Sequence, residues 1–174
     1  MYSKTISVLI FISTLLLTAC SDSSEPFELT ELTVETAQKV DNNKVFNVYK
    51  SPACGCCTSW IEYLEKQGAD VDSIHPGNLS EIKSQLGVLP RYRSCHTAVS
   101  AEGYVFEGHV PVKYINQFLA NKPVDAIGLA VPGMPVGSPG MEVGDRLSPY
   151  AVLLLKKDGT SSVYAQVNAF AEQY

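Results

Sequence analysis

Three cysteines fall within four positions where a strand-like segment gives way to a helix-like one. Residues 45–49 alternate apolar and polar side chains as a half-buried strand does, and Ser51-Pro52 interrupts that pattern. Residues 58–67 then carry large apolar side chains at helical spacing and end before Gly68. Cys54-Gly55-Cys56-Cys57 is therefore predicted to lie at a helix start, where the helix dipole favours the thiolate that binds metals and attacks disulfides.

The order of the remaining elements restricts the fold. We predict a strand at 69–74, a short helix at 79–86, two hairpin strands at 94–101 and 104–110, and a helix from Pro111 to residue 120. A β-α-β half followed by a β-β-α half is the outline of a thioredoxin-like fold, with the cysteine cluster at that fold's reactive position. The predicted fold class is thus α/β, with a mixed central sheet and flanking helices.

A loop and a hairpin are expected to complete the domain. Residues 127–144 are rich in glycine and proline, which predicts a long loop, and long loops in compact domains often carry function. Strands at 150–156 and 162–167 around Asp158-Gly159 predict a final hairpin. Since 174 residues suit one domain, we place a single metal-binding domain at residues 32–174.

The first 31 residues are predicted to direct and tether the protein. Lys4 precedes an apolar run at 5–17 that is too short to span a bilayer and is typical of a secretory signal. Leu17-Thr18-Ala19-Cys20 resembles the lipobox of bacterial lipoproteins, in which the cysteine is acylated and the chain is cut before it. We expect a signal peptide at 1–19, lipidation of Cys20 and a tether at 20–31. The alternative is an ordinary signal peptide with an incidental cysteine.

Location and charge limit the partners. Ser21 after Cys20 resembles the sorting signal for the outer membrane of Gram-negative bacteria, so we predict a periplasmic protein anchored by lipid alone. No later apolar run is long enough for insertion into the bilayer. A net charge of -5, from 13 basic and 18 acidic residues, offers no basic patch to a phosphate backbone. We therefore expect no nucleic acid partner.

Three roles compete for the cysteines. Cys54 and Cys57 have the Cys-x-x-Cys spacing of a dithiol oxidoreductase, in which Cys54 attacks and Cys57 resolves. Cys56 is redundant in that chemistry, whereas additional thiolates suit a metal. Structural disulfides that also use Cys95 are the third role, but bridges between neighbours close loops too small to constrain the unfolded chain. We favour the metal site, assign no catalytic residue to it, and keep the Cys54/Cys57 dithiol as the alternative.

Two histidines can join the cysteines through the predicted hairpin. If Glu102-Gly103 forms a two-residue turn, His96 lies opposite His109. If the loop has three residues, 101–103, Cys95 faces His109 instead. Cross-strand side chains are near enough to share a metal in either register. His75 lacks such partners and is left as a loop residue.

Ligand chemistry selects copper. Met134 and Met141 lie in the Gly/Pro-rich loop, where they have little core to fill, and thioether sulfur is a soft ligand that selects Cu(I). Thiolate, imidazole and thioether together suit Cu(I) or zinc, and the methionines favour copper. Closely spaced thiolates can bridge, so the site can be polynuclear. Arg91 and Arg93 either favour the Cys95 thiolate or are solvated loop charges.

The combined motifs resemble a known family. They are Tyr49-Lys50-Ser51-Pro52-Ala53-Cys54-Gly55-Cys56-Cys57, Ser94-Cys95-His96-Thr97, Glu107-Gly108-His109-Val110-Pro111 and the segment 128–142. In this order they resemble the periplasmic CopG family of Gram-negative copper-resistance proteins, which is unrelated to the plasmid repressor of that name. The resemblance implies a thioredoxin-like domain that binds copper through the Cys-x-Cys-Cys and Cys-His cysteines and interconverts Cu(I) and Cu(II). It also implies a role in copper resistance.

The favoured function is therefore a periplasmic copper-binding protein, with other periplasmic copper-handling proteins as expected partners. The alternative is a thiol-disulfide oxidoreductase, in which metal is adventitious. A third possibility is a lipid-anchored binding module whose Gly/Pro-rich loop meets a partner protein.

Overall fold

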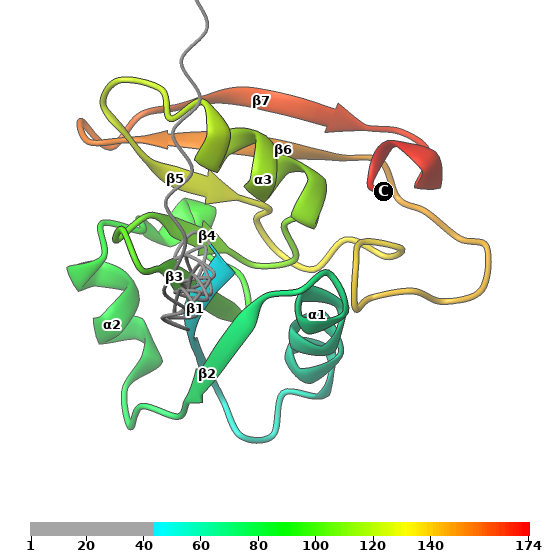
Figure 1. The fold of residues 1–174 in the computed structure, drawn as a ribbon, viewed down its shortest axis with the longest axis horizontal. Coiled ribbons are helices and arrows are strands. Elements are labelled where there is room, and N and C mark those ends of the chain that lie inside the picture. Colours follow the sequence, from blue (N-terminus) through cyan, green and yellow to red (C-terminus); the bar gives the residue numbers. More distant parts are fainter. Residues whose placement is uncertain (1–43) are drawn as a thin grey trace, which may run out of the picture. The chain divides into compact units, whose positions relative to one another are not determined.

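The computed structural model describes residues 44–174. The predicted signal peptide, Cys20 and the tether lie outside the described residues. The structure consists of a mixed seven-stranded sheet with three α-helices packed on it (Figure 1). Among residues 44–174, no helix combines the length and the apolar character needed to cross a bilayer.

Apart from β5, the elements follow the predicted order. The strands are β1 (Val45–Lys50), β2 (Asp70–Ile74), β3 (His96–Ser100), β4 (Val105–Glu107), β5 (Ala126–Ala130), β6 (Tyr150–Lys156) and β7 (Ser161–Val167). The helices are α1 (Gly55–Lys66), α2 (Leu79–Gln85) and α3 (Val112–Ala120), with short 3-10 helices η2 (Pro90–Tyr92) and η3 (Phe170–Glu172). The sheet order is β2-β1-β3-β4-β5-β6-β7, in which β1/β2 and β4/β5 are parallel and the other pairs antiparallel. The α/β, thioredoxin-like fold is confirmed.

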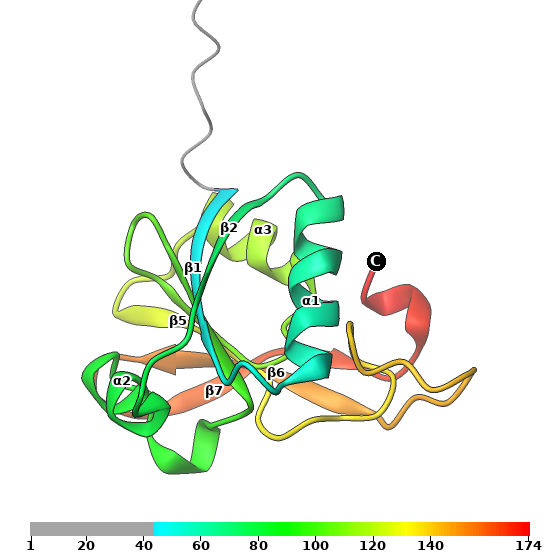
Figure 2. The ribbon, with the colours of Figure 1, turned by 90° about the horizontal axis from the view of Figure 1, so that it is seen from below.

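Two apolar clusters cover the two faces of the sheet. The larger cluster joins α1 and α3 to the sheet, with Trp60, Phe106 and Phe118 fully buried at its centre. The smaller one surrounds Val105 and Leu155 on the side of α2 and η2. Figure 2 shows α1 and α2 on opposite sides of β1. Because successive residues of a strand face opposite ways, the neighbours Val105 and Phe106 of β4 belong to different clusters.

The expectation of a loop from residue 127 is wrong at its beginning. Ala126–Ala130 forms β5, which pairs in parallel with β4. Gly128, which suggested a loop, instead permits close approach of the two strands, because a side chain there would overlap the Val105 carbonyl. Leu129 and Ala130 are fully buried. The long Gly/Pro-rich loop therefore runs from residue 131 to residue 149.

The β3–β4 hairpin settles the register. Thr97 pairs with Glu107 and Val99 with Val105, so the loop has three residues, 101–103. Gly103 has a φ of +86° and donates its N–H to the Ser100 carbonyl at 2.8 Å, as such loops require of their last residue. The two-residue turn is wrong, and the alternative register, which aligns Cys95 with His109, is confirmed.

Candidate metal centre

The Cys-x-Cys-Cys segment lies where β1 turns into α1. Cys54 is the N-cap residue of α1, and its N–H donates to the Ser51 carbonyl at 3.1 Å in the turn that leaves the strand. Its side chain makes no capping hydrogen bond. Cys57 is fully buried, whereas Cys54 and Cys56 are partly exposed. The first turn of α1 contains no acidic residue, so the positive end of the helix dipole faces these sulfurs without a competing carboxylate.

The structure holds this segment in an oxidised state. Cys54 and Cys57 form a disulfide, with their Cα atoms 5.3 Å apart, while Cys56 and Cys95 are free thiols. The sulfurs of all four cysteines nevertheless lie within 4.8 Å of one another, and the Cys54 and Cys56 sulfurs are 3.6 Å apart. Reduction of this disulfide would therefore present four thiols around one point.

A second group of donors shares one of these cysteines. The Cys95 sulfur lies 3.3 Å from Nδ1 of His96 and 3.1 Å from Nε2 of His109. The two imidazole rings meet edge to face, with their centroids 5.0 Å apart. Since Cys95 belongs to both groups, the four sulfurs and two imidazoles form one continuous donor set.

Both imidazoles are prepared to act as metal ligands. Nδ1 of His109 lies 2.8 Å from the Pro139 carbonyl, which only accepts hydrogen bonds, so Nδ1 carries the proton and Nε2 directs its lone pair at Cys95. His96 is fully buried, and its Nε2 has no hydrogen-bond partner. Burial lowers the pKa of both histidines, and the charges of His109 and Lys83 lower that of His96 further. Both are therefore neutral near pH 7.

Burial dominates the chemistry of Cys95. It raises the pKa of this thiol to about 11, although a hydrogen bond from Ser94 opposes the shift. The neighbouring arginines are engaged elsewhere. Arg93 donates to the Val88 carbonyl and to two serine hydroxyls on α2, and Arg91 donates to the Gly159 carbonyl. The structure therefore supports neither of the two roles considered for these arginines, because both guanidinium groups are hydrogen-bonded to other segments of the chain.

The Gly/Pro-rich loop closes over both ligand segments. Gly140 has a φ of +80°, and a Cβ there would lie 2.7 Å from the Trp60 nitrogen and 2.9 Å from the Cys56 carbonyl oxygen. Gly133 donates its N–H to the Arg93 carbonyl at 3.2 Å, and its own carbonyl accepts from the Ser94 hydroxyl. Figure 2 shows this loop, in yellow to orange, passing the N-terminal end of α1.

The two methionines follow these contact points. Met134 comes after Gly133 and is 53% exposed, whereas Met141 comes after Gly140 and is half-buried. Each is thus carried on a backbone segment that touches a cysteine-bearing segment. Their role as thioether ligands stays a prediction.

The structure also reveals a buried polar cluster that the sequence did not indicate. Lys83 of α2 and Glu107 of β4 form an ion pair at 2.5 Å, and both side chains are buried. Glu107 also accepts from the Thr97 hydroxyl and, at 2.6 Å, from the Ser94 N–H. The cluster thereby fixes the backbone next to Cys95. The available sequence signal for this cluster was the position of Glu107, a charged residue that directly follows the apolar residues Val105 and Phe106 in a predicted strand.

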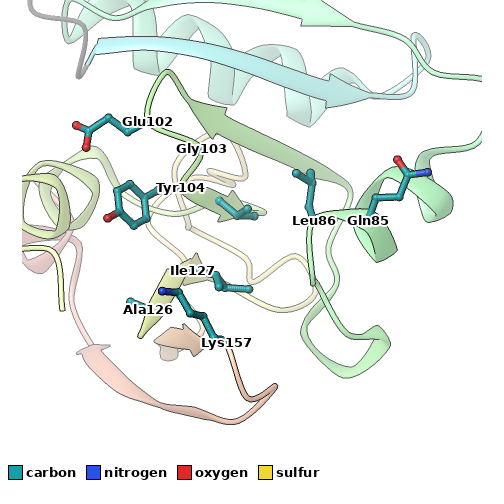
Figure 3. A pocket seen from close by; sticks show the side chains of 9 residues that line it. Gln85, Leu86, Glu102, Gly103, Tyr104, Ala126, Ile127 and Lys157 are labelled. Carbon is teal, nitrogen blue, oxygen red and sulfur yellow. The ribbon is translucent and has the colours of Figure 1, made fainter. Parts of the chain in front are cut away.

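Two other features lie apart from the donor set. His75 is exposed, and its Nδ1 contacts the Lys50 carbonyl at 3.1 Å. A cavity of about 390 Å³ lies at the opposite end of β3, around Tyr104 and Ile127 (Figure 3). Its charged lining residues, Glu102 and Lys157, are exposed, and Glu102 already pairs with Lys122 at 2.9 Å. The cavity therefore shows no sign of copper chemistry.

Comparison with known proteins places this arrangement among relatives. Two solved structures, described as copper resistance protein CopG form 2 and form 1, are 44% and 43% identical to the chain. The matched regions cover 71% and 72% of this chain and 98% of the chain of each solved structure, and both matches have a TM-score of 0.67. A model for a family of unknown function, DUF411, matches residues 92–141, which contain Cys95, both buried histidines and both loop methionines. No curated protein matches.

Proposed function

The chain belongs to the CopG family of copper resistance proteins, and we propose that it binds Cu(I) through the thiols of Cys54, Cys56, Cys57 and Cys95, with His96 and His109 as nitrogen donors. The observation that carries this proposal is the convergence of four sulfurs within 4.8 Å beside a fully buried imidazole whose Nε2 has no partner. Buried polar groups are normally satisfied, so an orphaned nitrogen at this place favours a ligand.

The donor set fits copper. Thiolates and imidazoles are soft to borderline ligands that suit Cu(I), and among the described residues no carboxylate belongs to either donor group. Four sulfurs this close can bridge, which supports a site for several copper ions. Met134 and Met141 are proposed to add thioether sulfur from the loop that covers the site.

The residues have separate tasks in this proposal. The N-terminus of α1 holds three cysteines and offsets thiolate charge, and Pro139 keeps the lone pair of His109 directed at Cys95. Copper must displace the proton from Cys95, because burial raises the pKa of that thiol to about 11. The Cys54–Cys57 disulfide must be reduced before its sulfurs can bind.

The proposal also includes interconversion of Cu(I) and Cu(II) at this site. Opening the disulfide takes up two electrons and two protons to yield two thiols, and oxidation of two Cu(I) ions to Cu(II) releases two electrons. The two couples therefore balance within one site. The mixed sulfur and nitrogen donor set supports both copper states.

We further propose the cellular setting. The lipobox-like sequence before Cys20 supports a lipid-anchored protein in the periplasm, on the outer membrane, where it would receive copper from other copper-handling proteins. Fatty-acid labelling of the wild-type chain and of Cys20→Ser, followed by membrane fractionation, tests this. Label that persists without Cys20, or none in the wild type, would reject the anchor.

An anaerobic titration tests copper binding. The chain from Ser21 onward is reduced and titrated with Cu(I) against a strong chelator, while near-ultraviolet thiolate-to-copper absorption is followed. Cys56→Ser and Cys95→Ser should abolish tight binding, since serine is a poor ligand for Cu(I). His75→Ala, at an exposed histidine outside the donor set, is the matched control. Retention of full affinity in both cysteine variants would refute the proposal.

The second candidate is a thiol-disulfide oxidoreductase, favoured by the Cys54–Cys57 disulfide itself. In that case a Cys56→Ser/Cys95→Ser double variant would keep dithiol turnover, because only the outer pair takes part. The same double variant destroys the copper site. Measuring disulfide exchange and copper retention on one preparation therefore separates the two functions.

A further inference from the structure

Within the part of the chain that the structure describes, Lys50 is a buried cation without a carboxylate partner. It is the last residue of β1 and is only 4% exposed. Its Nζ donates to the Ser51 carbonyl at 3.1 Å. Among residues 44–174, the ion pairs within 4.0 Å are Lys83–Glu107 and Lys122–Glu102, and neither includes Lys50. A buried charge without a counter-charge is strongly destabilising, so something else must supply the negative charge.

Lys83 is a buried lysine of this protein whose charge is neutralised by a carboxylate. It is also 4% exposed, yet its ammonium lies 2.5 Å from Glu107 and 2.8 Å from the Thr97 hydroxyl. Lys50, buried to the same extent, has a single hydrogen bond to a neutral carbonyl. Among the described residues, Lys50 therefore lacks the counter-charge that Glu107 gives to Lys83.

The position of Lys50 identifies the source of that charge. The Ser51 carbonyl that accepts its ammonium also accepts the Cys54 N–H, and both nitrogens lie 3.1 Å from this oxygen. Across the sheet, Lys50 pairs with His96, so the two side chains share one face. The ammonium is thus hydrogen-bonded to the turn that carries Cys54, and its residue lies on the same face of the sheet as His96.

We propose that Lys50 provides the positive counter-charge of the reduced, copper-bearing thiolate cluster. This inference rests on the proposed copper binding. Four thiolates carry four negative charges and each Cu(I) ion neutralises one, so any loading with fewer than four coppers leaves an anionic group. In the oxidised protein the disulfide removes two of those charges. Lys50 therefore increases copper affinity while it destabilises the copper-free, oxidised fold.

These opposite effects distinguish a counter-charge from a structural lysine. Lys50→Met keeps the apolar stem but removes the charge, so it should weaken Cu(I) affinity about ten- to a hundredfold, the effect expected when an anionic group loses a nearby unit charge. The copper-free, disulfide-bonded protein should unfold at an equal or higher temperature. A lysine that only supports the fold would lower both quantities when replaced.

Two further variants separate the charge from the hydrogen bond. Lys50→Gln can still donate to the Ser51 carbonyl but is neutral, so its affinity should fall as that of Lys50→Met does. Lys50→Arg keeps the charge and should stay within about threefold of the wild type. Lys66→Met, at an exposed lysine in the last turn of the same helix that carries the cysteines, is the matched control and should bind as the wild type does.

The experiment uses the chain from Ser21 onward, reduced and titrated with Cu(I) under chelator competition, together with thermal unfolding of the oxidised, copper-free form. Weaker binding in Lys50→Met and Lys50→Gln, without loss of thermal stability, supports the inference. Wild-type affinity in Lys50→Gln, or a lowered unfolding temperature in both neutral variants, overturns it. If the wild type itself retains no copper, the proposed function fails instead.

Discussion

Two polar clusters flank the same ends of β3 and β4, and they differ in how their groups are satisfied. On the side of α2, Glu107 accepts hydrogen bonds from Lys83, Thr97 and Ser94, and the buried charges neutralise each other. On the side of α1, and within residues 44–174, His96 has a nitrogen without a partner, two thiols are free and Lys50 has no carboxylate partner. The satisfied cluster holds the backbone, whereas the unsatisfied one is the site that we propose for copper.

The largest expected effect breaks the satisfied cluster. Glu107→Gln keeps the shape of the side chain but leaves the Lys83 ammonium buried without a counter-charge, so it should lower the free energy of unfolding by about 3–5 kcal/mol. Urea unfolding of the copper-free protein measures this. Adding Lys83→Met should recover most of the loss. A loss below about 1 kcal/mol would show that the ion pair does not support the fold.

The next largest effect is expected where the Gly/Pro-rich loop contacts α1, next to the unsatisfied cluster. Gly140→Ala would drive a Cβ into the backbone of α1, whereas Gly144→Ala, at a φ of +56°, meets nothing within 4 Å. In both variants alanine is strained by the left-handed backbone, so the difference between their unfolding free energies reports the contact between residue 140 and α1. We expect Gly140→Ala to cost about 1–3 kcal/mol more in unfolding free energy. Equal losses would mean that the loop does not rest on α1 in solution.

Acid should act on the unsatisfied cluster through its histidines. Burial lowers the pKa of His96 and His109 below that of an unfolded histidine, so the unfolded chain binds more protons in acid. Their contribution to stability is complete above about pH 6.5 and declines as the pH falls toward the lowered values, by at most about 1.4 kcal/mol per pH unit for each histidine.

Unfolding of the copper-free protein in urea between pH 7.5 and 5.5 measures this slope. A His96→Asn/His109→Asn variant should flatten it, because asparagine does not titrate. A wild-type stability that stays constant across this range would contradict buried, neutral imidazoles.

The smallest effect is expected at an exposed ion pair, which serves as the reference for the buried pair. Lys122 and Glu102 form an ion pair at 2.9 Å, with side chains 30% and 37% exposed. Glu102→Ala should therefore change the unfolding free energy by less than about 1 kcal/mol. A loss as large as that of Glu107→Gln would remove the contrast between the buried and the exposed pair.

Sequence reasoning predicted the fold, and it predicted that these cysteines and histidines lie together, because each left a local pattern. The Cys-x-Cys-Cys segment follows a strand of alternating residues, and helix-period apolar residues follow it in turn. The pairing of Cys95 with His109 was one of two registers, since the sequence around Gly103 permits both a two-residue and a three-residue loop. Only the positive φ of Gly103 in the folded hairpin decides between them.

The features that sequence reasoning missed depend on contacts between distant segments. Gly128 resembles a loop glycine, but in the sheet it allows β5 to approach β4. Lys83 lies in a short amphipathic helix where a lysine is normally solvated, and its burial depends on Glu107, which lies 24 residues further along the chain. Lys50 stands at a strand end, where a lysine is also ordinary. In each case the partner, and not the local sequence, determines the role.

Copper binding through sulfur by the unsatisfied cluster on the α1 side can be tested by X-ray absorption at the copper edge, on reduced and Cu(I)-loaded protein. We predict a first coordination shell dominated by sulfur, with less sulfur in Cys56→Ser than in the wild type. A shell of nitrogen and oxygen alone, or identical spectra for the wild type and Cys56→Ser, would contradict it.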